Sequence, residues 1–290
     1  MTSYRLLVVS CLCLVALAGL AQDDPMSGAA PLRPLPMGDM LLSLPSNQIA
    51  PHGQWEMKFT HRFNQSLDQG SFSDQVHSLF GLDTNADVVF GFAYAVRPNL
   101  QLSLARSNTN DTIEAAAKYV VFRQADGRPF TMTLRGGTDL RTEKDLGDRT
   151  SVFAQAIVSR QFGRKAEIFL LPTFATHAGR AVSGDGSAAL FEHAFNMPVA
   201  FAWMLRPGFA AVAELTPPNQ DLPDSMEADF GWAVGVKRNI GGHWFEILIT
   251  NTQSTLVDQY VTTTFQGTPL DTGNMHLGFN IERRFGKRKQ

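Results

Sequence analysis

Polar and apolar residues alternate along most of this chain. The alternation is clearest over residues 54–63, QWEMKFTHRF, where the two kinds of residue change places at almost every step. A period of two is typical of a β-strand with one polar and one apolar face. The pattern recurs to the C-terminus, with no amphipathic helix of useful length between its segments. It predicts about twelve strands, near residues 54–63, 87–97, 100–107, 112–123, 130–138, 151–162, 166–177, 194–205, 209–215, 229–239, 243–250 and 274–285.

The connections between these strands alternate in length. Tight turns rich in Gly, Pro, Asn and Asp follow every second strand, at residues 97–99, 125–129, 163–165, 206–208 and 239–242. The other connections are mostly long, at residues 64–86, 139–150, 178–193, 216–228 and 251–273, with 108–111 as the short exception. This sorting is typical of an up-and-down antiparallel barrel in the outer membrane, with short turns at the periplasmic rim. A soluble Greek-key sandwich has no reason to sort its loops this way.

Aromatic residues gather at the predicted periplasmic rim, as is typical of the girdle at a membrane interface. They are Trp55, Tyr94, Phe130, Phe162, Trp203, Phe209 and Phe285. The alternative is that rings bracket strand ends, as in any β-protein. After the first 21 residues no apolar run has the length of a transmembrane helix, and only helices and closed barrels cross a bilayer. We therefore predict an all-β fold, a transmembrane up-and-down β-barrel.

Composition agrees with a barrel and excludes one class of partner. The chain has 290 residues, a formal net charge of −2, 18% charged and 44% hydrophobic residues. A nucleic-acid partner would need a concentrated basic face, so none is expected. The low charge content suits a barrel, because about half of each strand must face lipid.

The first 21 residues are predicted to be a cleaved signal peptide. Arg5 supplies the positive start, residues 6–20 the apolar run, and Gly19 and Ala21 the small residues before the cut. The alternatives are an uncleaved membrane anchor or a lipid-modified Cys11. Both cysteines of the chain, Cys11 and Cys13, lie in this segment, so the mature chain is expected to contain neither a disulfide nor a thiol.

The rest of the chain is predicted to form two parts. Residues 22–50 contain five prolines and no sustained periodicity, which indicates an extended N-terminal segment rather than a domain. A location in the periplasm is compatible with this pattern. Residues 51–290 are predicted to form the barrel domain.

The polar faces of the predicted strands should line the lumen. The candidate lumen-lining residues are Glu56, Lys58, Arg62, Glu114, Lys118, Arg135, Glu214, Lys237, Glu246, His276, Asn280, Glu282 and Arg284. Their mixed signs are compatible with a salt-bridged, filled interior or with a weakly selective passage. A barrel of about twelve strands encloses a narrower lumen than the sixteen or more of open porins.

The sequence carries no strong signal for catalysis, a metal or a cofactor, so none is expected. Residues 83–87, DTNAD, begin like a calcium loop but lack the Gly and Glu that an EF-hand needs further on. The seven histidines show no helical metal spacing, and no Gly-x-Ser-x-Gly motif occurs. The acidic stretch 139–148 is interpreted as a solvated loop. A lipid-modifying barrel hydrolase stays open as an alternative.

Three short segments resemble a family of exported bacterial β-barrel proteins of unknown function. They are HRF at 61–63, GGHWF at 241–245 leading to Asn251, and LGFN at 277–280 leading to Phe285. The resemblance implies an outer-membrane barrel and no established activity. The last strand also resembles the recognition signal of the barrel-insertion machinery, although residues 286–290 extend beyond the usual terminal Phe and Arg283 interrupts the apolar face.

The sequence therefore predicts a protein of the cell outer membrane that contacts membrane lipid and the insertion machinery. It is expected to be a narrow channel or a binding barrel for small solutes. The alternative is a structural or surface-interaction barrel without transport.

Overall fold

The structure is a computed structural model of the chain. It describes residues 35–68, 70–142, 150–182, 188–219, 227, 229–265 and 268–286. The predicted signal peptide, residues 22–34 and the last four residues lie outside this part. Within it, no helix is both long and apolar enough to cross a membrane.

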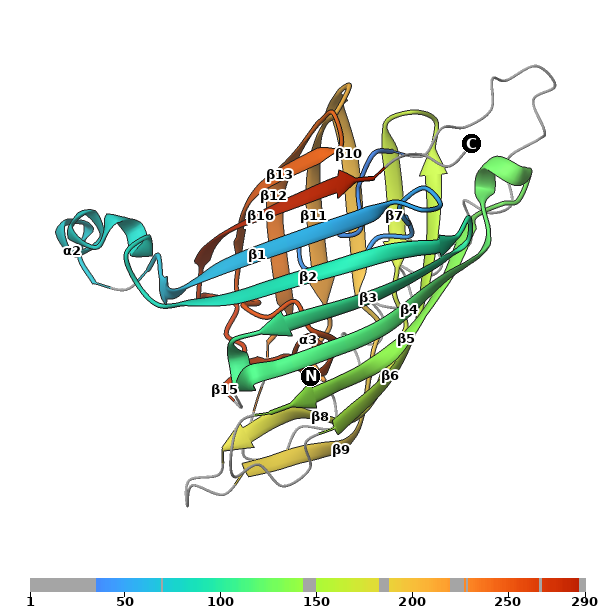
Figure 1. Ribbon diagram of the computed structural model, residues 1–290. Coiled ribbons are helices and arrows are strands. Elements are labelled where there is room, and N and C mark those ends of the chain that lie inside the picture. The colour runs from blue at the N-terminus through green and yellow to red at the C-terminus, as the bar shows by residue number, and fades with distance from the viewer. Residues whose placement is uncertain are drawn as a thin grey trace, which may run out of the picture. The chain divides into compact units, whose positions relative to one another are not determined.

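Fourteen antiparallel strands form one closed sheet (Figure 1). They are β1 (Trp55–Ser66), β2 (Ala86–Arg97), β3 (Leu100–Ser107), β4 (Thr112–Phe122), β5 (Thr131–Arg141), β6 (Thr150–Phe162), β7 (Ala166–Leu170), β8 (Thr173–Val182), β9 (Ala188–Asn196), β10 (Val199–Arg206), β11 (Phe209–Thr216), β12 (Gly231–Ile240), β13 (His243–Thr250) and β16 (His276–Phe285). Most strands pair with the strands next to them along the chain, but β6 pairs with both β7 and β8, and β10 pairs with β7. β1 pairs with β16, which closes the ring. The first and the last strand that the alternation predicts are therefore hydrogen-bonded to each other.

Two wall strands are each broken by a proline. Pro172 separates β7 from β8, and Pro198 separates β9 from β10. Proline has no N–H to donate to a neighbouring strand, so the hydrogen-bonded ladder is interrupted there although the chain continues in line. β6 pairs with both β7 and β8, so the fourteen strands make a barrel of twelve wall strands. The predicted fold class is confirmed.

The connections carry the remaining elements. The β1–β2 loop holds α2 (Phe72–His77) and η2 (Leu79–Gly81), which stand away from the barrel wall (Figure 1). The β13–β16 loop holds α3 (Val257–Tyr260), β14 (Thr264–Phe265) and β15 (Thr268–Pro269). Single turns η3 (Thr109–Asp111) and η4 (Gln124–Asp126) follow β3 and β4.

Two of the predicted loops are shorter than expected. The predicted loop 178–193 is wrong, because β8 and β9 continue their pairing to Val182 and Ala188. The predicted loop start at Asp139 is also wrong, because β5 runs on to Arg141 with β4 and β6 on either side. Continued hydrogen bonding to a neighbouring strand extends a strand beyond the point where its apolar residues end.

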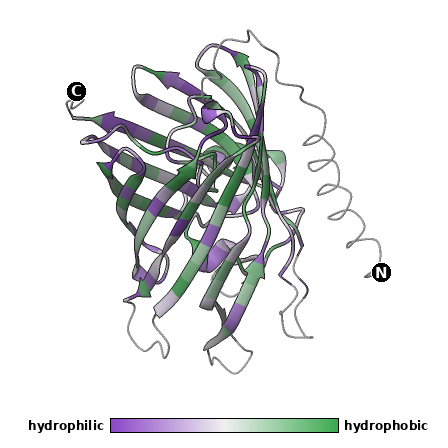
Figure 2. Cartoon of the chain, turned by 90° about the vertical axis from the view of Figure 1, so that its right-hand side faces the viewer, coloured by the Kyte–Doolittle hydropathy of each residue, from purple (hydrophilic) through white to green (hydrophobic). Residues whose placement is uncertain are grey.

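Burial is inverted relative to a soluble protein. Outward positions expose large apolar side chains, such as Leu104 (58% exposed), Ile247 (63%) and Val234 (47%), while the inward positions between them are mostly buried, many of them polar or charged. Figure 2 shows the resulting alternation of hydrophobic and hydrophilic residues along the strands. An apolar exterior is what a lipid solvent requires.

Aromatic rings lie at the ends of the strands that carry the short turns. Trp55, at the start of β1, packs on Tyr94 with ring centroids 4.6 Å apart and lies opposite Phe285 in the register. Trp55, Phe162 and Phe285 are exposed. These positions suit rings at a membrane interface.

The interior of the barrel is filled by two chain segments. Residues 35–50, here called the lumen segment, and residues 251–265, the inner loop, are almost entirely buried. The sequence predicts an extended leader up to residue 50, whereas residues 35–50 are packed inside the barrel. The sequence of the lumen segment does not show this, because the side chains that it packs against come from distant strands of the wall.

Candidate functional site in the barrel lumen

The lumen segment forms a compact loop without a helix or long strand. Leu41 N–H donates to the Leu44 carbonyl at 2.8 Å, and Ser46 N–H donates to the Asp39 carbonyl at 2.9 Å. Gly38 has a φ of +76°, and a Cβ there would lie 2.9 Å from the Glu282 carboxylate oxygens. Glycine therefore allows both the left-handed turn and the close approach to the wall.

Carboxylates of the wall accept the backbone N–H groups of this loop. The Asp39 N–H donates to Glu56 at 2.8 Å and to Glu282 at 2.7 Å. Glu214 accepts from three consecutive backbone N–H groups, those of residues 42–44, at 2.7, 2.9 and 3.1 Å. The wall thus satisfies donors that an irregular buried loop would otherwise leave unpaired.

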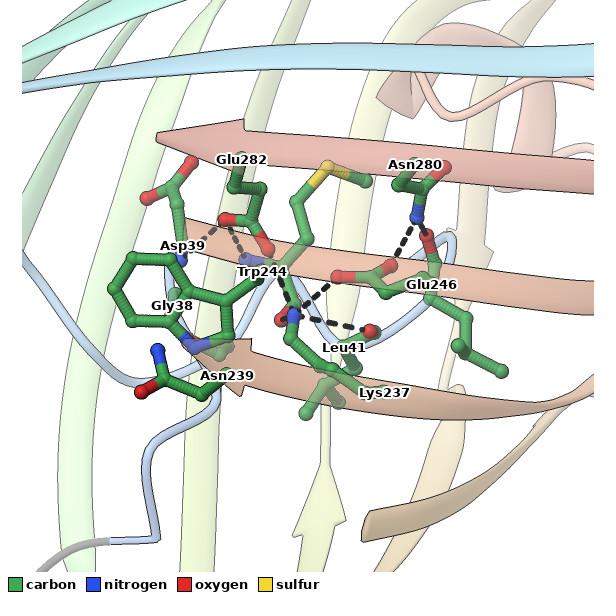
Figure 3. A network of polar contacts seen from close by, with 12 residues as sticks. Gly38, Asp39, Leu41, Lys237, Asn239, Trp244, Glu246, Asn280 and Glu282 are labelled. Atoms are coloured by element: carbon green, nitrogen blue, oxygen red, sulfur yellow. Dashed lines mark hydrogen bonds and ion pairs between the residues drawn. The ribbon is translucent and has the colours of Figure 1, made fainter. Parts of the chain in front are cut away.

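Cationic and amide groups of the wall donate to the backbone carbonyls (Figure 3). Lys237 Nζ donates to the Met40 carbonyl at 2.6 Å and also pairs with Glu246 at 2.5 Å and Glu282 at 2.7 Å. The Leu42 carbonyl accepts from Asn280 at 2.7 Å and from Arg62 at 3.1 Å. Donors and acceptors of the loop are therefore matched from neighbouring wall strands.

The side chain of Asp39 is the one charged group of the lumen segment. Its Oδ1 accepts from Lys118 Nζ at 2.6 Å and from Gln101 Nε2 at 2.7 Å. Burial alone would raise the pKa of the Asp39 carboxyl, but the cations Lys118, Lys58 and Arg135 together lower it well below its ordinary value. Asp39 is therefore ionised and provides the counter-charge of Lys118.

The opposite side of the lumen segment is apolar. Its leucines and Met37 lie with apolar side chains of β6 to β13 in one buried cluster. The members include Leu35, Met37, Leu41, Leu42, Leu44, Ile157, Phe169, Ala200, Ala202, Val212 and Leu248. Alanines on the inward face of β10 leave room for the leucines of the segment. The lumen therefore has a polar and an apolar side.

The inner loop is anchored by a second network. Arg141 and Asp258 pair at 2.7 Å, and the Asp258 N–H donates to Asp139 at 3.1 Å. The Tyr260 hydroxyl accepts from Gln155 at 2.7 Å. Burial raises the pKa of the Asp258 carboxyl despite the opposing effect of Arg141, and burial likewise raises the pKa of the Tyr260 phenol.

A small cavity lies where the two segments meet. Its volume is about 10 Å³, which is room for roughly one water molecule. It is lined by Ser43 and Leu44 of the lumen segment, Tyr260 of the inner loop, and Glu214 and Thr216 of β11, among others. This cavity is too small to hold a solute.

A family model described as a membrane-bound beta barrel domain, DUF5777, matches residues 38–285. The chain belongs to this family. The match includes most of the lumen segment together with the barrel, and the resemblance noted from the sequence is confirmed. No curated protein matches the chain.

Solved structures with a similar fold are outer-membrane barrels. The NanC porin has a TM-score of 0.50 and 9% identity, and the alignment covers 80% of this chain and 100% of the porin. An outer membrane channel from Pseudomonas putida F1 has a TM-score of 0.49 and 10% identity, covering 82% of this chain and 97% of the channel. The outer membrane phospholipase A from Escherichia coli has a TM-score of 0.39 and 10% identity, covering 82% and 94%. At such identities the likeness concerns the fold alone. Together with the membrane-bound barrel family, it makes this chain a protein of the outer membrane.

The structure places the thirteen candidate lumen-lining residues on inward positions of their strands. Seven of them contact the lumen segment or lie beside it in the networks above: Glu56, Arg62, Lys118, Glu214, Lys237, Asn280 and Glu282. Four others, Glu114, Arg135, Glu246 and Arg284, form ion pairs with side chains of neighbouring wall strands. Arg135 pairs with Glu114 at 2.5 Å, Arg284 with Glu56 at 2.7 Å, and Glu246 with Lys237.

The last two candidates are less involved in this network. Lys58 is half-buried and approaches Gly91, and its charge helps to lower the pKa of Asp39. His276 lies 3.1 Å from the Phe63 carbonyl, near the opposite end of β1 from Trp55. Among the described contacts, neither side chain forms a hydrogen bond or an ion pair with residues 39–46.

Several functional candidates were not identified from the sequence. Asp139 and Arg141 share the inward parity of Arg135, so a longer run of the period of two would have found them. Asp39 and Asp258 lie in segments without periodicity, and no local signal marks them. The interpretation of residues 139–148 as a solvated loop is corrected for Asp139 and Arg141, both fully buried. Residues 143–149 lie outside the described part.

Residues of the calcium-like stretch have another role. Asp87 accepts hydrogen bonds from the hydroxyls of Ser107 at 3.0 Å and Thr109 at 2.6 Å. Among the residues that the structure describes, no group of three or more His, Cys, Asp or Glu side chains could hold a metal ion. That no metal or cofactor takes part stays a prediction.

Proposed function

We propose that this barrel is a channel for small solutes, closed in the described state by the lumen segment and the inner loop. The observation that carries the proposal is the charged side of the lumen. There Lys237, Glu246 and Glu282 lie fully buried, with Arg62 and Glu56 nearby.

Buried ion pairs are weak contributors to stability, because removal of two charges from water offsets most of their attraction. A barrel that needed only a permanent filling would be served as well by apolar residues. A wall of charged and amide groups has a further use if water and solute reach it when the lumen segment moves. Twelve wall strands enclose a narrow passage, which limits the cargo to small solutes. The NanC porin, similar in fold, supports a transport role by analogy alone.

The second candidate is a structural barrel without transport, and the apolar side of the lumen favours it. Leu41, Leu42 and Leu44 are at most 1% exposed. Each buried leucine contributes on the order of 1.5–3 kcal/mol, which opposes release of the segment.

Two finer expectations also belong to this proposal. The absence of enzyme activity stays a prediction, and turnover of phospholipid or lipopolysaccharide by the purified barrel would contradict it.

Recognition by the barrel-insertion machinery is supported by β16, whose Leu277, Phe279 and Ile281 share the outward face and whose last residue, Phe285, is exposed.

The test is a planar-bilayer conductance measurement on three folded chains. The first is the natural chain. The second, the linker variant, replaces residues 35–50 by a Gly/Ser stretch of the same length. The third, the double linker variant, also replaces residues 252–264. Folding is checked by resistance to SDS before heating and by a mobility shift after boiling.

The natural chain is expected to show rare or no openings, and the double linker variant a steady current. The linker variant shows which of the two segments closes the passage. If the folded double linker variant carries no current, the channel is excluded and the structural barrel is supported.

A further inference from the structure

Asp39 is bound in the lumen through two chemically different ends. Its backbone N–H donates to the carboxylates of Glu56 at 2.8 Å and Glu282 at 2.7 Å. Its side-chain carboxylate accepts from Lys118 at 2.6 Å and Gln101 at 2.7 Å. All four wall side chains are at most 4% exposed. The wall thus presents acids to the nitrogen of this residue and donors to its carboxylate.

The nitrogen end of this site offers more negative charge than a backbone amide needs. The amide has one proton and no charge, so Glu56 and Glu282 share a single donor. An ammonium group has three protons and a full positive charge, and could donate to both carboxylates separately. Lys237 and Arg284 form ion pairs with the carboxylates Glu56, Glu246 and Glu282. Arg62 faces Glu246 and Glu214, so the surrounding network holds four carboxylates against three cations. An ammonium would balance this charge.

The carboxylate end depends on the lumen segment for its charge balance. Lys118 donates to the Asp39 carboxylate at 2.6 Å, to the Asp39 backbone carbonyl at 3.2 Å and to the Gln48 carbonyl at 3.1 Å, all of them groups of the lumen segment. When the segment moves, Lys118 loses all three of these acceptors. A buried cation left without acceptors is strongly disfavoured, so this end would then favour a new carboxylate.

We propose that the vacated site binds an amino acid, a small solute that carries an ammonium and a carboxylate two or three bonds apart. Asp39 imitates such a solute while the lumen segment is in place, since three bonds separate its nitrogen from its carboxylate carbon. The inference rests on the proposed function, because a solute reaches this site only after the segment moves.

A solute with only one of the two groups fits the site poorly. Acetate pairs with Lys118 and Gln101 but leaves Glu56 and Glu282 with their excess charge. Methylammonium does the reverse. Buried polar groups left unpaired discriminate strongly between ligands, so both ends must be filled together.

The direct test is isothermal titration calorimetry on the folded linker variant. The probes are β-alanine and glycine, with acetate and methylammonium as single-ended controls at equal ionic strength. Either amino acid is expected to bind at least about tenfold more tightly than the better control. Lys118→Gln or Glu282→Gln in the same background should each weaken binding about tenfold or more, and Lys165→Gln, in the β6–β7 turn, should have no effect. Equal binding of all four probes, or no loss with Lys118→Gln, overturns the proposal.

A second measurement covers failure of the linker variant to fold. The Trp244 indole N–H donates to the Pro36 carbonyl at 2.7 Å, so its fluorescence reports on the position of the lumen segment. In the otherwise natural chain with Asp39→Ala, β-alanine should displace the segment and change the emission, and Trp244→Phe should remove that change. An acetate and methylammonium mixture should have less effect, and equal effects of mixture and β-alanine overturn the proposal.

Conductance separates this inference from the proposed channel. Amino-acid binding without current in the double linker variant supports the site and excludes the channel. Current without preferential amino-acid binding supports the channel and excludes the site.

Discussion

Arg141 and Asp258 form an ion pair of 2.7 Å in which neither side chain has exposed surface. Arg141 is the last residue of β5, whereas Asp258 lies in α3, so the pair joins the wall to the inner loop. Arg141 also donates to the His177 carbonyl at 2.6 Å. Three separate parts of the chain thus meet at one buried cation, and the inner loop is held in the lumen there.

Removal of one partner of this pair is expected to destabilise the barrel strongly. Asp258→Ala leaves Arg141 buried without its counter-charge, which should reduce the free energy of unfolding by about 3–5 kcal/mol. The double variant Arg141→Met with Asp258→Leu should lose less, since neither charge is then buried. Urea unfolding in lipid vesicles measures both.

The matched control is the ion pair of Arg106 and Asp111, which has a similar distance of 2.6 Å but exposed side chains (57% and 49%). Arg106→Ala should change the free energy of unfolding by less than about 1 kcal/mol. Equal losses for Arg106→Ala and Asp258→Ala would contradict the anchoring role of the buried pair.

Gly38 and Gly127 allow a matched test of the lumen segment. Both have left-handed backbone, with φ of +76° and +77°. A Cβ on Gly38 meets the Glu282 carboxylate at 2.9 Å, whereas one on Gly127 meets nothing within 4 Å. Alanine at either site carries the backbone strain of about 1–2 kcal/mol, and only Gly38→Ala should also loosen the lumen segment.

Trp244 emission and limited proteolysis of residues 35–50 measure that loosening. Gly38→Ala should shift the emission and speed the cleavage, whereas Gly127→Ala should leave both as in the natural chain. If the two variants behave alike, the contact with Glu282 does not hold the segment.

The wall of the barrel was predictable from the sequence because its physics is local. A strand between lipid and lumen must alternate, so the period of two located all twelve wall strands and the inward parity of residues such as Glu56 and Lys237. Pro172 and Pro198 interrupt the hydrogen-bonded ladder without changing the path of the chain. Strand ends were missed where inward positions turned polar, as at Asp139.

The filling of the barrel was not predictable in this way. The lumen segment is irregular, and its leucines carry no period that distinguishes a buried loop from an exposed leader. The pairing of Asp39 with Lys118 spans 79 residues and that of Arg141 with Asp258 spans 117. Such contacts depend on the closed ring, which brings together side chains that no spacing in the sequence relates.

Acidification is expected to weaken the hold on the lumen segment. The pKa of Asp39 lies below its ordinary value of 3.8, so ionised Asp39 stabilises the folded state above about pH 4. This contribution declines as the pH falls below that value. The difference in free energy of unfolding between the natural chain and Asp39→Asn should therefore be constant from about pH 7 to 5 and shrink below about pH 4.

Lys118→Met provides the control for this effect. Without Lys118, the loss of an ionised Asp39 should move to higher pH, because burial then opposes ionisation with less compensation. Unfolding curves at a series of pH values measure the shift. A difference between the natural chain and Asp39→Asn that grows on acidification would contradict this assignment.

The outward face supplies a test of the membrane-spanning arrangement itself. Ile247 on β13 is 63% exposed and Val76 on α2 is 47% exposed, so in a soluble protein a lysine would be tolerated at both. In a bilayer, Ile247→Lys places a charge against lipid and should reduce the free energy of unfolding by about 2–4 kcal/mol if it lies near the midplane. Val76→Lys lies on a helix that stands away from the wall (Figure 1) and should change it by less than about 0.5 kcal/mol. Urea unfolding in vesicles compares the two, with Ile247→Leu as the apolar control, and similar small effects of both lysines would show that β13 does not face lipid.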